Sequence, residues 1–146
     1  MKFGDILKEY RKQLKLSVNQ LSKLSNVSVG YISKLENNKR KFPTIRTLFL
    51  LLVGFKNSKL NDQSKSIQDV DNEIKDILNE FISAEDSDID TEKLENLHND
   101  FITFYEDLHK KVGNNDKRNK KKNIFVYEDD EKEKHSVNLE KSINDI

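Results

Sequence analysis

The fold of this chain is decided by residues 18–37, which read VNQLSKLSNVSVGYISKLEN. Ser17, the residue just before this stretch, is spaced from Gln20 as in a capping box, where each side chain accepts a hydrogen bond from the other residue's backbone amide. The pair predicts a short helix over residues 18–25.

This helix is expected to end at a turn that leads into a second one. Asn26 tolerates the left-handed backbone conformation, and Ser28 offers a new N-cap two positions later. A further helix is predicted from Val29 to about Asn37. Two short helices separated by about three turn residues are the layout of a helix-turn-helix motif.

Apolar residues at helical spacing flank the motif on both sides. The spacing predicts an amphipathic first helix from Phe3 to about Leu14. Beyond the motif, Pro43 and Thr44 start a fourth helix, whose run Leu48–Phe55 is too apolar for a helix with one solvated face. With only 1 Pro and 4 Gly in 146 residues, the chain is expected to be all-α.

A second helical unit is predicted after a polar linker over residues 57–65. Apolar residues then recur by threes and fours, with a like-charged turn at residues 85–88 between two such stretches. This pattern predicts a helical hairpin over residues 66–113. Because one apolar stripe per helix leaves little core, we expect the hairpin to form a homodimer; packing on the first 56 residues and binding another protein are the alternatives. The stripe consists of Ile67, Val70, Ile74, Ile77, Phe81, Leu94, Leu97, Phe101, Phe104 and Leu108.

The last segment, residues 114–146, has a different composition. A basic run at 117–122 and an acidic run at 128–131 flank only four apolar residues. Such blocks of like charge predict a largely disordered tail. The expected organisation is therefore a head over residues 1–56, the linker, the hairpin and this tail.

Charge divides the chain in the same way. The totals are equal, 26 basic and 26 acidic residues, but residues 1–56 hold 12 Lys and Arg against 3 Asp and Glu. Residues 66–116 hold 4 basic and 15 acidic residues. A basic head predicts binding to nucleic acid, and an acidic hairpin should be held away from it.

Several classes of protein are excluded by composition. Hydrophobic residues make up 34% of the chain, too few for one well-filled core throughout. Because there is no cysteine, a disulfide framework, a zinc ribbon and a thiol nucleophile are excluded. A membrane-spanning helix is not expected, because the longest apolar run is far shorter than the roughly 20 residues that span a bilayer. The N-terminus lacks the apolar region of a signal peptide. We expect a cytoplasmic protein without a membrane partner; its abundant Lys, Asn and Ile suit an AT-rich bacterial, phage or plasmid genome.

Catalytic and metal-binding patterns are nearly absent. Glu95 and His98, and again Glu106 and His109, have the i, i+3 spacing of metal ligands. The two pairs lie 11 residues apart on one helix, about 16 Å, which is too far to share an ion. With no phosphate loop and no nucleophile motif, we expect neither an enzyme nor a cofactor.

At residues 18–37 the sequence closely resembles the helix-turn-helix of the phage-repressor and Cro-like (XRE) regulators. The resemblance extends from about Phe3 to Phe55 and implies a four- to five-helix, lambda-repressor-like domain. It assigns buried positions to Leu21, Val27, Ile32 and Leu35. Asn26 and Asn38 replace the family's turn glycines, and Ser22 its usual alanine. A clear fifth helix after Phe55, which in many relatives builds the dimer contact, is missing.

The resemblance also implies how DNA would be bound. The recognition helix enters the major groove with its N-terminal residues against base edges. The matching positions are Val29, Gly30, Ser33 and Lys34. Phosphate or mixed contacts are implied for Ser17, Asn19, Tyr31, Lys39, Arg40 and Lys41. Arg11 and Glu36 match an ion pair between the first and third helices of related repressors.

These features together predict a sequence-specific, DNA-binding transcriptional regulator. We expect a dimeric repressor that occludes a palindromic operator in double-stranded DNA. The alternative is a DNA-tethered interaction module, antitoxin-like or controlled by an antirepressor, whose acidic hairpin captures a regulatory protein.

Overall fold

The computed structural model describes the backbone of residues 1–114 and the side chains of residues 1–110. This part of the chain is all-α, as the sequence predicts. The predicted tail lies outside it, apart from Asn114 at its start. The described helices are α1 (Phe3–Gln13), α2 (Val18–Ser25), α3 (Val29–Glu36), α4 (Ile45–Leu60), α5 (Ile67–Ile82), the 3-10 turn η1 (Thr91–Lys93) and α6 (Leu94–Asn114).

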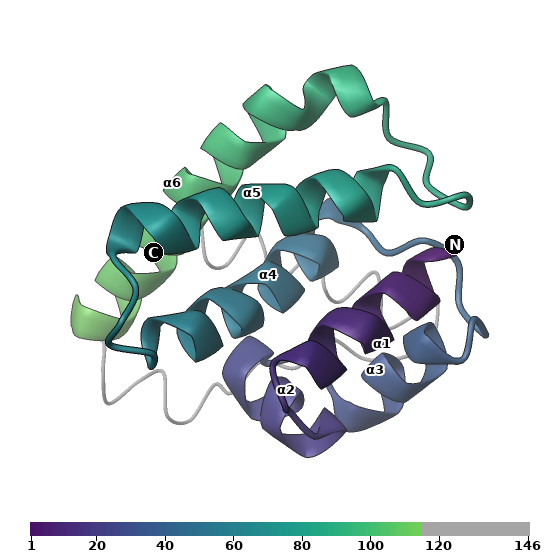
Figure 1. Cartoon of the computed structure of the whole chain (residues 1–146), viewed down its shortest axis with the longest axis horizontal. Coiled ribbons are helices and arrows are strands. Elements are labelled where there is room, and N and C mark those ends of the chain that lie inside the picture. Colours follow the sequence, from purple (N-terminus) through teal and green to yellow (C-terminus); the bar gives the residue numbers. More distant parts are fainter. Residues whose placement is uncertain (115–146) are drawn as a thin grey trace.

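Helix α4 lies at the centre of the molecule, with α1, α2 and α3 on one side and α5 and α6 on the other (Figure 1). Every residue from Arg46 to Lys56 is buried. The sequence indicates the central position of α4, because a helix without a polar face must be surrounded by other parts of the protein. The structure shows that the covering comes from the same chain. No helix in the described part is long and apolar enough to cross a membrane.

Two glycines allow the close helix packing on the α1–α3 side. A methyl group at Gly4 would lie 2.0 Å from the carbonyl oxygen of Leu35, so α1 approaches the backbone of α3 too closely for a side chain. At Gly54 a methyl group would lie 2.9 Å from Cδ1 of Leu21, where α4 packs against α2. The packing of α1 on α3 therefore depends on a residue without a Cβ atom at Gly4, whereas at Gly54 the Leu21 side chain would have to shift.

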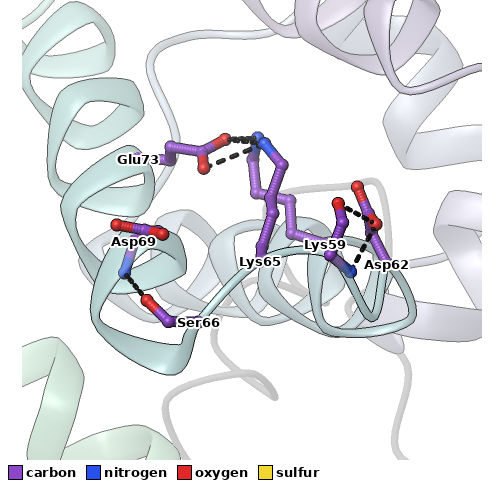
Figure 2. Close-up of polar contacts among 7 residues, drawn as sticks. Lys59, Asp62, Lys65, Ser66, Asp69 and Glu73 are labelled. Atoms are coloured by element: carbon purple, nitrogen blue, oxygen red, sulfur yellow. Dashed lines mark hydrogen bonds and ion pairs between the residues drawn. The ribbon is translucent and has the colours of Figure 1, made fainter.

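The connection between α4 and α5 is shorter than the predicted linker over residues 57–65. Helix α4 continues to Leu60, and the Nζ atoms of Lys59 in its last turn and of Lys65 in the connection both donate to Glu73, each at 2.7 Å (Figure 2). These two lysines lower the pKa of the Glu73 carboxyl. The Ser66 hydroxyl then caps α5.

Helix α5, the first helix of the predicted hairpin, also serves as the fifth helix of the N-terminal bundle, a role that the sequence does not reveal. Its residue Phe81 packs against Phe3, Tyr10 and Phe55, with ring centroids 4.8, 6.4 and 6.3 Å away. Because these rings come from α1 and α4, α5 closes the N-terminal bundle. The expectation that the bundle lacks such a helix was wrong, because the polar connection separates α5 from it in sequence but not in space.

Helix α6 covers what remains of α4. Phe101 and Phe104 pack on Phe49, with centroids 5.6 and 5.5 Å apart. Buried Lys56 donates to Asp71 of α5 at 2.8 Å and lies 4.0 Å from the ring centroid of Tyr105 on α6. The contacts of Lys56 thus join three helices.

The apolar stripe predicted for dimerisation is used inside one chain. Its side chains on α5 and α6 belong to a hydrophobic cluster that runs from Phe3 to Tyr105, which corresponds to the predicted alternative of packing on the head. Ile67, 70% exposed, is the exception within the stripe. Dimerisation remains a prediction. The division of residues 1–56 and 66–113 into separate domains also remains a prediction, and in the structure these two parts share one hydrophobic core. Fully or largely buried are Val70, Ile74, Ile77, Phe81 and Phe101, and partly buried are Leu94, Leu97, Phe104 and Leu108.

Candidate nucleic-acid interface

Helices α2 and α3 are each started by the cap that the sequence predicts. The amide of Gln20 donates to the Ser17 hydroxyl at 3.0 Å, and the amide of Ser17 donates to the Gln20 side chain at 2.7 Å. Asn26 ends α2 in the left-handed conformation, with φ 61°. Ser28 accepts from the amide of Tyr31 at 3.2 Å and caps α3. The predicted layout of helix, turn and helix is confirmed.

One face of α3 is directed into the core. Ile32 and Leu35 are buried, as expected from their spacing. Tyr31 is fully buried as well, which corrects its assignment as a residue that reaches phosphate or base. Its ring packs beneath the guanidinium of Arg40, whose Cζ lies 5.6 Å from the ring centroid. Tyr31 therefore supports the loop after α3 instead of contacting DNA itself.

The opposite face of α3 is open to solvent. Val29 is 42% exposed, Gly30 and Lys34 are exposed, and Ser33 is half-buried. Residues at these positions share one side of an α-helix. The structure therefore brings together on one surface the four residues implied to read bases.

Candidate phosphate contacts lie at both ends of the motif. Ser17 and Asn19 are exposed at the start of α2. Lys39 and Lys41 are exposed and Arg40 is half-buried in the loop between α3 and α4. Asn38 begins this loop with φ 58°, the conformation expected of a residue that stands in for glycine, and its side-chain amide donates to Asp5 at 3.1 Å.

An ion pair fixes α3 against α1. Nε and Nη2 of Arg11 donate to the two carboxylate oxygens of Glu36 at 2.6 and 2.8 Å, and Nη1 donates to the carbonyl of Leu16 at 2.8 Å. The hydrogen bonds to Glu36 raise the pKa of Arg11. Bidentate pairs of this kind add orientation as well as energy. Both side chains are largely buried, so neither is placed to contact bases.

A contact between the N-terminus and the turn after α5 has no signal in the sequence. The N-terminal ammonium of Met1 lies 2.6 Å from the Glu85 carboxylate, and the amide of Phe3 donates to Asp86 at 2.8 Å. Hydrogen bonding to Glu85 raises the pKa of the terminal amine. These residues are more than 80 positions apart, so no local pattern could have paired them.

The two possible metal-ligand pairs on α6 have other contacts. Glu95 forms an ion pair with Lys75, and the ring of His109 packs against that of Tyr105 in a tilted arrangement with centroids 4.3 Å apart. Burial lowers the pKa of His98. In the part of the chain with described side chains, no three His, Asp or Glu side chains are grouped to hold a metal ion.

The exposed face of α3 and its capped, ion-paired support define a helix-turn-helix domain. A helix-turn-helix family model matches residues 7–58. The chain is 43% identical over 54 residues to the HTH-type transcriptional repressor RghR of Bacillus subtilis, a match that covers 37% of this chain and 40% of that protein. It is 48% identical over 46 residues to the HTH-type transcriptional regulator RghRB of the same organism, covering 32% and 33%.

The N-terminal domain is therefore similar to the helix-turn-helix domains of the phage-repressor and Cro-like (XRE) regulators. Both of these relatives are named as transcriptional regulators. The match spans less than half of each of these relatives, so the target DNA and the partners of the whole protein are proposals.

Proposed function

We propose that this protein is a sequence-specific, DNA-binding transcriptional regulator that acts as a repressor by occluding a promoter or operator. The observation that carries the proposal is the solvent-exposed face of α3. It presents four residues side by side on a helix held in place by a cap and an ion pair. An α-helix fits the major groove of B-DNA, where each base pair shows a distinct pattern of donors and acceptors.

Each side chain on this face has a chemistry suited to base edges. Lys34 can donate to O6 or N7 of guanine, and Ser33 can bond several bases. Val29 can contact the methyl group of thymine, while Gly30 lets the backbone come close. The reading of sequence is thus assigned to Val29, Gly30, Ser33 and Lys34.

Affinity is assigned to the flanking polar residues. Lys39, Arg40 and Lys41 would bind phosphates after the recognition helix, and Ser17 and Asn19 would do so at the start of α2. Phosphate contacts supply affinity without reading sequence and position the protein on the duplex.

We further propose that two copies bind a palindromic operator in the cytoplasm. Helix-turn-helix proteins of this class use two heads on half-sites about 34 Å apart. Because the apolar stripe of α5 and α6 is buried within one chain, the contact between copies would use a different surface.

Selection of bound fragments from genomic DNA tests the proposal. The purified protein should enrich a short sequence with two-fold symmetry. In gel-shift competition, unrelated DNA should compete poorly with this sequence for the protein. Enrichment of no sequence over random DNA would refute sequence-specific binding.

The acidic surface of α5 and α6 favours a second candidate, a DNA-tethered module that captures a regulatory protein. Its charged side chains, including Asp76, Glu80, Asp100 and Asp107, are exposed. Native mass measurement discriminates the two. A chain that is monomeric on operator DNA and that assembles with another protein there would favour the module, whereas a homodimer on DNA favours the repressor.

A further inference from the structure

The turn between α5 and η1 carries carboxylates to the edge of the proposed DNA-binding surface. A cavity of about 440 Å³ lies between this turn and the loop that follows α3. Its lining combines cationic residues, Lys2, Arg40 and Lys41, with an acidic wall, the name used below for Asp86 and Asp88. The cavity thus brings together opposite charges from segments that are far apart in the chain.

The position of the acidic wall is fixed by hydrogen bonds. Asp86 accepts from the amide of Phe3, the first residue of α1, at 2.8 Å. The amide of Glu85 donates to the carbonyl of Met1 at 3.1 Å, and the terminal amine pairs with the Glu85 carboxylate. The turn is therefore attached to the same helix that Arg11 locks onto α3.

We propose that Asp86 and Asp88 set the affinity of the protein for DNA by opposing phosphate binding at Arg40 and Lys41. The inference rests on the proposed function, because it assumes that this loop contacts the DNA backbone. A phosphate held by those cations would face the carboxylates across the cavity. The negative carboxylates repel the negative phosphate, so DNA of any sequence is bound more weakly. Base contacts then account for a larger share of the binding energy.

The size of the effect follows from Coulomb's law. Two unit charges about 7 Å apart in water interact by an amount equivalent to about a threefold change in affinity. Removing both carboxylates should therefore raise affinity about tenfold at low salt. The gain should shrink as salt increases, because screening shortens the range of the repulsion from about 30 Å at 0.01 M to about 10 Å at 0.1 M.

The test compares two double variants of the full chain with the same change in net charge. D86N/D88N neutralises the acidic wall, and the amide introduced by D86N retains a side-chain oxygen that can accept from Phe3. E106Q/D107N is the matched control, since both residues are exposed in the C-terminal half of α6, which lies at the opposite end of the molecule from the turn (Figure 1). Thermal melting checks that both variants keep the stability of the parent.

Fluorescence anisotropy then measures binding to a random-sequence duplex and to a selected operator. We expect D86N/D88N to bind both duplexes about tenfold more tightly at low salt, with the control changed by less than about twofold. Equal affinities for the two variants would overturn the inference, since net charge alone would then explain any gain. A parent chain that binds neither duplex would instead refute the proposed function itself.

Discussion

The guanidinium of Arg11 and the carboxylate of Glu36 join α1 to the end of α3 through two hydrogen bonds of 2.6 and 2.8 Å. The third nitrogen of Arg11 bonds the carbonyl of Leu16, just before the helix-turn-helix motif. One side chain therefore fixes both the entry to the motif and its exit. The orientation of the exposed face of α3 depends on this pair.

Replacing Arg11 with Ala should destabilise the fold strongly. The change leaves the largely buried Glu36 carboxylate without its partner, a loss that typically amounts to about 3–5 kcal/mol of unfolding free energy. Urea denaturation measures it. At a temperature where the variant remains folded, its order of preference among DNA sequences should match that of the parent; a changed preference would show that Arg11 reads bases.

Gly4→Ala and Gly30→Ala separate packing from recognition. At Gly4 the added methyl group meets the carbonyl oxygen of Leu35 at 2.0 Å, so α1 must move and the melting temperature should fall by several degrees. At exposed Gly30 alanine should leave stability unchanged or raise it by up to about 1 kcal/mol, because it favours helix. Only the second variant should weaken operator binding in the folded protein, and equal melting temperatures for the two would contradict the close packing of α1 on α3.

Ile74→Ala tests whether the apolar stripe serves the monomer. Ile74 is buried in the core of one chain, so its truncation should lower the unfolding free energy by about 2–5 kcal/mol. The loss should be the same at every protein concentration, as measured by calorimetry over about a hundredfold range. If Ile74 served a dimer contact, the loss would depend on concentration.

Acid should weaken the attachment of α6 through His98. Burial, aided by the positive charge of Lys75, lowers the pKa of His98 from its ordinary value of 6.5, and nearby Asp71 and Glu95 offset only part of this. The folded chain then binds fewer protons than the unfolded chain, so stability is present above about pH 6.5 and falls as the pH drops below it. Urea midpoints between about pH 7.5 and 5.5 should show this fall, reduced in His98→Gln.

His109→Gln is the matched control for that experiment, since His109 lies on the same helix and is exposed. It should keep the pH dependence of the parent. An undiminished fall in His98→Gln would assign the acid sensitivity to other groups.

Much of the N-terminal bundle could be predicted because its signals are local. Caps at Ser17, Ser28 and Thr44 act within one turn of helix, and each is formed in the structure. The apolar run of α4 correctly indicates a helix covered on every side. What covers it could not be predicted, since a second copy and a later segment of the same chain bury an apolar face equally well.

The sequence places the candidate site on the predicted recognition helix, but it does not show which side chains of that helix are exposed. Val29, Gly30, Ser33 and Lys34 lie on the open face of α3, while Tyr31, placed there by resemblance, is buried. An aromatic residue on a short helix can face either side, and the guanidinium that packs on this ring comes from Arg40, nine positions later. The acidic wall at Asp86 and Asp88 depends on tertiary contacts alone and had no local signal.

The most direct test of the central claim compares Lys34→Ala with Lys39→Ala. Each variant loses one positive charge, but Lys34 is assigned to base contacts and Lys39 to phosphate contacts. Competition between the selected operator and variants altered at single base pairs should show that Lys34→Ala loses about 1–3 kcal/mol and relaxes one position of the site. Lys39→Ala should weaken all sequences alike and reduce the dependence on salt. If Lys34→Ala, and Ser33→Ala with it, bound every duplex as the parent does, α3 would not be the helix that reads DNA.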